Sequence, residues 1–131
     1  TYIDSVCDIK MARDIVVDAK TQKPSVCNAL ETLLVSESVA KEFLPLIGRD
    51  LIEKGVEIRA DQQSSDLLGI DSVPASNEDW RTEYLDAKIS IKTVEDSAIN
   101  GNWSFHEQCF KGLCGDYEGV GTKPTVVFDY C

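Results

Sequence analysis

The chain is poor in the residues that prevent compact folding. Its 131 residues include only four prolines and eight glycines, while 43% are hydrophobic. A collagen-like or intrinsically disordered chain has the opposite composition. At this length a folded domain buries roughly two-thirds of the surface that its unfolded chain exposes. The composition therefore predicts one globular domain and excludes a large multi-domain enzyme for the chain as given.

Long apolar runs and an excess of positive charge are also missing. No run approaches the roughly 18 to 20 apolar residues that a membrane-spanning helix needs, and residues 1–8 lack the charged and apolar stretches of a secretory leader. Thirteen Lys and Arg stand against 23 Asp and Glu, and the net charge of -10 repels phosphate backbones and anionic lipids. We therefore expect a cytoplasmic protein that binds neither nucleic acid nor membranes. Its first residue is Thr instead of Met, which indicates a processed chain or a piece of a longer one.

Cysteine is more frequent than the rest of the composition suggests. The count of five is odd, so at least one thiol lies outside any internal disulfide; the cysteines are Cys7, Cys27, Cys109, Cys114 and Cys131. Their uneven distribution favours a reducing compartment for residues 1–100. The later ones cluster with His106, but their spacing fits no common zinc pattern, so we predict no metal site. A local disulfide and free thiols both stay open for residues 101–131.

The hydrophobic spacing predicts helices that alternate with strands. We expect helices at 8–20, 24–35, 36–54 and 62–68, strands at 56–60, 85–92 and 125–128, a loop at 71–79, and irregular turns at 101–121. Ser36 is a suitable N-cap for the third helix, and Gly55 a suitable stop. Such alternation is typical of an α/β layer structure.

Cys27 is the candidate nucleophile. Pro24 suits the first position of a helix, and this would place Cys27 in the first turn of helix 24–35, where unpaired N–H groups and the helix dipole stabilise a thiolate. A thiolate there can attack a carbonyl, and nearby N–H groups can hold the oxyanion that forms. On this chemistry alone, a small buried residue of an apolar helix is the stronger interpretation.

Four segments in a fixed order change that balance. Residues 18–35 read DAKTQKPSVCNALETLLV, and EFLP at 42–45, KGVEIR at 54–59 and EDWRTEYLD at 78–86 follow. Together they closely resemble the catalytic-cysteine region of the gamma-glutamyl phosphate reductase family, also called glutamate-5-semialdehyde dehydrogenase, in the aldehyde dehydrogenase superfamily. The resemblance covers about 1–100 only. We therefore divide the chain into a catalytic-domain segment, 1–100, and an unmatched Gly/Cys-rich tail, 101–131.

The resemblance implies both a fold and a reaction. The fold is a three-layer α/β segment of an aldehyde-dehydrogenase-like catalytic domain, followed by an irregular tail. In that family a cysteine thiolate displaces phosphate from L-glutamyl 5-phosphate, and hydride from NADPH reduces the thioester to glutamate 5-semialdehyde, the second step of proline biosynthesis. By this resemblance Cys27 is the nucleophile, Asn28 helps to position it, and Glu83 matches the glutamate that contacts the nicotinamide-side ribose of NADP(H).

The sequence also departs from that family. No Gly-rich phosphate loop opens a helix after a strand, so we expect this chain alone to bind NADPH poorly. The alternative function is a non-enzymatic fragment or interaction module that lacks the cofactor-binding half. Lys20 and Arg81 are candidates for contact with substrate anions, but a solvated structural role is the stronger expectation for each. A homo-oligomer stays open.

Overall fold

The fold is a sheet of mainly parallel strands with helices on one of its faces. The computed structural model describes residues 1–95, 126 and 127. The strands are β1 (Tyr2–Ile3), β2 (Thr32–Ser36), β3 (Glu57–Ala60), β4 (Val73–Pro74), β5 (Lys88–Val94) and β6 (Val126–Val127). The helices are α1 (Ile9–Thr21), α2 (Glu37–Glu53) and α3 (Gln62–Leu68), and a single 3-10 turn, η1, spans Asp79–Arg81.

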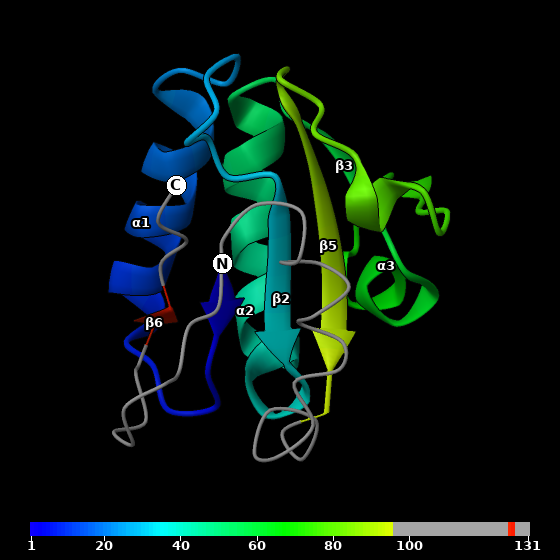
Figure 1. Cartoon of the computed structure of the whole chain (residues 1–131). Helices are drawn as coiled ribbons and strands as arrows, with labels where there is room; N and C mark the ends of the chain where they lie inside the picture. Colours follow the sequence, from blue (N-terminus) through cyan, green and yellow to red (C-terminus); the bar gives the residue numbers. More distant parts are fainter. Residues whose placement is uncertain (96–125, 128–131) are drawn as a thin grey trace, which may run out of the picture.

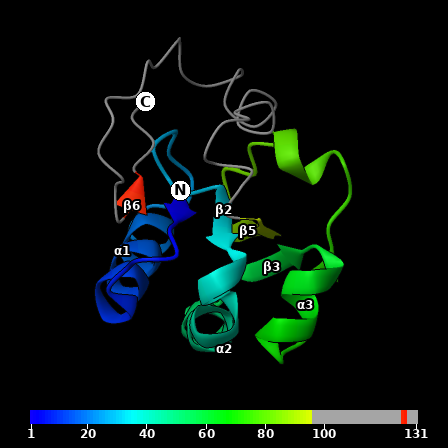
Figure 2. The ribbon, with the colours of Figure 1, turned by 90° about the horizontal axis from the view of Figure 1, so that it is seen from below.

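The described strands form one six-stranded sheet in the order β4-β3-β5-β2-β1-β6. Strands β1 to β5 pair in parallel, and β6 pairs antiparallel to β1. Helices α1, α2 and α3 lie side by side on one face of this sheet (Figures 1 and 2). The predicted α/β fold is confirmed, and the described residues supply the sheet together with one helical layer.

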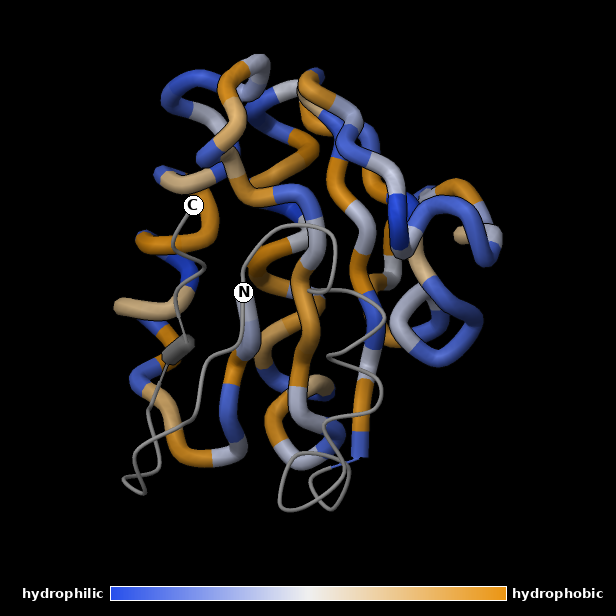
Figure 3. The backbone as a smooth tube through the Cα atoms, viewed as in Figure 1, coloured by the Kyte–Doolittle hydropathy of each residue, from blue (hydrophilic) through white to orange (hydrophobic). Residues whose placement is uncertain are grey.

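The hydrophobic core lies between the sheet and α2. Figure 3 shows apolar residues along β2 and an alternation of apolar and polar residues along β5. The register places Leu33 of β2 beside Ile91 of β5, so both point to the helical layer. Fully buried residues of α2 meet them there, namely Phe43, Leu44, Ile47 and Leu51.

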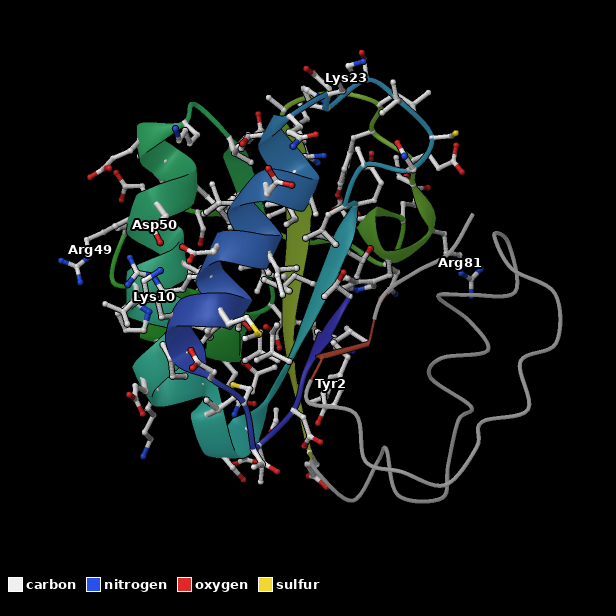
Figure 4. The ribbon with its side chains drawn as sticks, turned by 90° about the vertical axis from the view of Figure 1, so that its left-hand side faces the viewer. Tyr2, Lys10, Lys23, Arg49, Asp50 and Arg81 are labelled. Carbon is white, nitrogen blue, oxygen red and sulfur yellow. The ribbon has the colours of Figure 1, made fainter. Side chains whose placement is uncertain are left out.

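Helix α1 begins and packs as its sequence predicts. Asp8 caps it by accepting a hydrogen bond from the Met11 N–H at 2.9 Å, which satisfies one of the unpaired donors of the first turn. The guanidinium of Arg13 donates two hydrogen bonds to the Asp50 carboxylate of α2, at 2.8 and 2.9 Å. Arg49, next to Asp50 in the sequence, points away from α1 (Figure 4). The two hydrogen bonds between Arg13 and Asp50 fix α1 against α2.

Helix α2 also confirms the sequence prediction. Ser36 accepts a hydrogen bond from the Ser38 N–H at 3.3 Å, and the helix ends at Glu53, just before Gly55, whose φ of 75° is readily available to glycine. The helix continues through Pro45. Within residues 1–95, 126 and 127, no helix has the length and apolar character needed to cross a membrane.

The predicted helix at 24–35 is wrong. The chain forms turns over 22–31 and then strand β2, which pairs with β1 on one side and β5 on the other. A central strand is buried on both faces, so its apolar run lacks the alternation that marks a half-buried strand. The spacing of the leucines then resembles a helix, but hydrogen bonds to two neighbouring strands decide the structure.

Smaller differences concern the ends of the sheet. The strand predicted at 85–92 begins only at Lys88, because Leu85 has a left-handed φ of 49° that no regular strand accommodates. The predicted loop at 71–79 contains the short strand β4 and the start of η1. Strand β6 confirms the centre of the strand predicted at 125–128, whereas the predicted turns at 101–121 lie outside the described residues.

A larger side chain at Gly48 would test the packing between α2 and α3. A Cβ at this position would lie 2.8 Å from Leu68 Cδ2 and 3.0 Å from Ile70 Cδ1. We predict that Gly48→Val lowers the free energy of unfolding by about 2 kcal/mol, because the larger side chain overpacks this contact. Urea unfolding measures the change, with Lys41→Val at an exposed site of the same helix as the control for β-branching. Equal losses in the two variants would contradict the packing described here.

Candidate active site

Cys27 lies in an exposed loop, 22–31, between α1 and β2 (Figure 1). Two hydrogen bonds shape its turns: Val26 N–H donates to the Lys23 carbonyl at 3.3 Å, and Ala29 N–H donates to the Val26 carbonyl at 3.0 Å. The prediction that Cys27 occupies the first turn of a helix is therefore wrong. The turns hold the cysteine at the surface instead, at the edge of the sheet where β2 begins.

The segments that carry the other candidate residues meet at the same edge. Asn28 is exposed and follows Cys27 in the loop, and Glu83 is exposed in the segment 82–87 that leads into β5. Strands β2 and β5 are parallel neighbours, so the segments that enter them lie at the same end of the sheet. The structure thus brings the two segments together.

Glu31 joins the Cys27 loop to the segment 82–87. Its Oε2 accepts a hydrogen bond from the Tyr84 N–H at 3.1 Å. Its backbone carbonyl accepts another from the Ser90 N–H at 3.0 Å. One residue at the end of the loop therefore holds both the start of β5 and the segment before it. Sequence reasoning missed Glu31, although a charged residue directly before the apolar run of β2 is a usable signal.

Lys20 lies beside Glu31 at the other end of the loop. Its side chain is fully buried, and its Nζ lies 3.7 Å from Glu31 Oε1, which is too long for a hydrogen bond. Burial lowers the pKa of the Lys20 ammonium, and the nearby Glu31 carboxylate opposes that shift. Burial likewise raises the pKa of the Glu31 carboxyl against the effect of Lys20 and the backbone N–H groups. The solvated role expected for Lys20 is therefore wrong.

A second polar cluster fixes the segment 76–84. The buried Asp79 carboxylate accepts four hydrogen bonds, from the Ser76 N–H (2.7 Å), Ser76 Oγ (2.8 Å), Tyr84 Oη (2.8 Å) and Arg59 Nη1 (3.0 Å). Burial alone raises the pKa of Asp79, but these donors outweigh it and bring the pKa to about 2. The Arg59 guanidinium also lies 5.8 Å from the centre of the Tyr84 ring. Sequence reasoning missed this cluster: Ser76 and Tyr84 lie within five residues of Asp79, but Arg59 comes from β3, 20 residues earlier.

Other candidate ligands are placed less favourably. Arg81 is exposed and points away from the ribbon on the side of the sheet opposite α1, whereas Lys23 lies in the Cys27 loop (Figure 4). Across 1–95 and 126–127, no three His, Cys, Asp or Glu side chains gather as metal ligands. The cluster of His106 with the later cysteines lies outside the described residues.

The described residues fit only a small part of a dinucleotide. The exposed Glu83 carboxylate can accept hydrogen bonds from a ribose. No Gly-rich turn between a described strand and the following helix is present for a pyrophosphate.

Comparisons with known proteins show which family this chain resembles. No protein-family model matches the chain. Gamma-glutamyl phosphate reductase of Dictyoglomus turgidum is 51% identical over 100 residues, which are 75% of this chain and 24% of the relative. The same enzyme of Francisella philomiragia is 47% identical over 114 residues, 83% of this chain and 27% of the relative. The crystal structure of gamma-glutamyl phosphate reductase from Thermotoga maritima matches with a TM-score of 0.72 and 44% identity, over 79% of this chain and 25% of that chain. The resemblance to gamma-glutamyl phosphate reductase is confirmed.

The similarity between this chain and its relatives covers only part of each relative. The chain spans about a quarter of the length of the gamma-glutamyl phosphate reductases that it matches. The match to the Thermotoga maritima structure extends the likeness from sequence to fold, because an α/β arrangement with a parallel sheet is shared. The roles of individual residues are a separate question, since identity over a segment does not by itself assign chemistry to side chains.

The lowered pKa of Asp79 predicts how the free energy of unfolding of this gamma-glutamyl phosphate reductase-like segment depends on pH. A pKa lowered from 3.8 to about 2 contributes about 2 kcal/mol of stability above pH 4, which is lost as the pH falls towards 2. We predict that Asp79→Asn lowers the free energy of unfolding by that amount at pH 7 and that the difference shrinks below pH 4. Urea unfolding across this range measures it, with the exposed Asp71→Asn as the control. A difference that stays constant with pH would contradict the assignment.

Proposed function

We propose that this chain carries the nucleophile segment of a reductase that converts L-glutamyl 5-phosphate to glutamate 5-semialdehyde in proline biosynthesis. The observation that carries the proposal is the position of Cys27, exposed at the sheet edge where the segment of Glu83 also lies. Relatives named gamma-glutamyl phosphate reductase support the substrate class, a small acyl phosphate. A cytoplasmic location is part of the same proposal.

The first step needs only the cysteine and the acyl phosphate. The Cys27 thiolate attacks the acyl carbon, the bond from that carbon to the phosphate oxygen breaks, and phosphate leaves with the bonding electron pair. A thioester on Cys27 is the product, and no net oxidation or reduction occurs in this step. Backbone N–H groups of the loop, including that of Cys27, are suited to stabilise the oxyanion, while Asn28 helps to position the nucleophile.

The second step needs an electron donor. Reduction of the thioester to the aldehyde requires a hydride, which is the chemistry that NADPH supplies when bound. The exposed Glu83 carboxylate would accept hydrogen bonds from the ribose on the nicotinamide side. Because 82–87 is joined to the Cys27 loop through Glu31, Glu83 would orient the cofactor relative to the nucleophile.

A non-enzymatic interaction module is the second candidate. The described residues offer no Gly-rich turn for a pyrophosphate. This observation favours a described part that folds and associates without carrying out the complete reaction. The two candidates differ in whether Cys27 accepts an acyl group.

Acyl transfer to Cys27 tests the proposal directly. We predict that the full chain, incubated with acetyl phosphate, releases phosphate and gains an acetyl group at Cys27, as read by mass-mapping of peptides. Cys27→Ser is expected to lose both signals because it removes the thiolate.

Cys7 provides the matched control. Burial, together with the carboxylates of Asp4, Asp8 and Glu42, raises the pKa of the Cys7 thiol, so this cysteine is expected to react slowly at neutral pH. Cys7→Ser should leave phosphate release unchanged. Equal acetylation of Cys7 and Cys27, or phosphate release that survives Cys27→Ser, would favour the interaction module instead.

A further inference from the structure

Glu31 occupies an unusual place between the two segments that carry the candidate site. It lies four residues after Cys27 and directly before β2. Its carboxylate accepts a hydrogen bond from the Tyr84 N–H at 3.1 Å, and Tyr84 directly follows Glu83. A single side chain thus links the nucleophile loop to the segment of the predicted cofactor contact.

Lys20 closes the loop from its other end. The Lys20 Nζ and the Glu31 Oε1 are buried, lie 3.7 Å apart, and have no hydrogen-bond partner in the described part of the chain. A buried ion pair with such geometry adds little to stability, because desolvation opposes the attraction between the charges. The neighbouring hydrogen bond from the Leu30 N–H to the Ala19 carbonyl, at 3.0 Å, also ties the loop ends together. The position of the pair at the two ends of the loop points to a role in holding the loop.

The backbone next to Tyr84 supplies an independent observation. Leu85 has a φ of 49°, a left-handed conformation that is unfavourable for a non-glycine residue. The Tyr84 N–H, one residue before Leu85, donates to Glu31 Oε2 at 3.1 Å, and the Leu85 N–H helps to lower the pKa of the same carboxyl. Successive N–H groups at a left-handed residue form a concave site for an anion. The Glu31 carboxylate occupies this site, and its attraction to the N–H groups opposes the cost of the backbone conformation.

We infer that Glu31, held by Lys20, is a positioning residue that fixes the Cys27 loop against segment 82–87. This inference rests on the proposed function, because positioning matters only if Cys27 and Glu83 act on the same bound molecules. Glu31 itself touches neither candidate side chain in any described hydrogen bond; it acts through the backbone that carries them.

Hydrogen exchange of the full chain tests the coupling. We predict that Glu31→Gln raises amide exchange about fivefold in both 22–31 and 82–87, because it weakens a charged hydrogen bond that holds the two segments together. Exchange in α2 should stay unchanged. Glu53→Gln, at an exposed position, is the matched control and should alter neither segment.

The double variant Lys20→Met/Glu31→Gln keeps the test decisive if a single variant fails to fold. It removes both buried charges at similar volume, so no unpaired charge is left inside the protein. The same joint rise in 22–31 and 82–87 is expected. A rise in only one of the two segments, or an equal rise throughout α2, would overturn the inference, since the pair would then serve general stability.

Acylation separates this inference from the proposed function. If Glu31 positions the nucleophile, Glu31→Gln should slow the acetylation of Cys27 by acetyl phosphate about fivefold while the alkylation of Cys7 by iodoacetamide stays the same. A wild-type chain that acetyl phosphate does not acylate would contradict the proposed function, and the exchange result would still decide the coupling. A wild-type chain that is acylated but shows no joint exchange would overturn the coupling alone.

Discussion

Parallel pairing of the central strands is the constraint on which the site depends. Each connection between successive parallel strands must bring the chain back to the end of the sheet where strands begin. Helix α1 provides that return before β2, and the segment 75–87 with η1 provides it before β5. The segments that enter β2 and β5 therefore meet at one edge, although they lie far apart in the sequence. The segments that carry Cys27 and Glu83 come to the same part of the molecule because of strand order.

The polar groups around this edge are of two physical kinds. Asp79 is fully provided with donors, and such a network makes its segment rigid in one arrangement. The Lys20 and Glu31 pair is buried but less well satisfied, and it lies beside the nucleophile loop. By contrast, the face of the sheet that the helices cover is apolar, and burial of these residues is the main source of stability. The polar groups at the end of the sheet where β2 and β5 begin set the positions of the loops.

Sequence patterns predicted most elements on the helical face. The cap at Ser36 and the stop at Gly55 mark α2 in the sequence because each acts within a few residues. Strand β2 resembles a helix in sequence because pairing with two distant strands leaves no local signature.

Only part of the candidate site can be predicted from the sequence. The resemblance located Cys27, Asn28 and Glu83, whose roles stay predictions, and it did not show that Cys27 lies in a loop. Glu31 and Tyr84 are 53 residues apart, so no periodicity could reveal their hydrogen bond.

Pro74 has a consequence for the outer edge of the sheet. The Ala75 N–H donates to the Ala60 carbonyl of β3 at 2.9 Å, and backbone groups alternate in direction along a strand, so the Pro74 nitrogen faces away from β3. That nitrogen carries no hydrogen. A foreign strand approaching β4 finds a missing donor at the position where ladder formation would begin, and this discourages amyloid-like growth from this side of the protein.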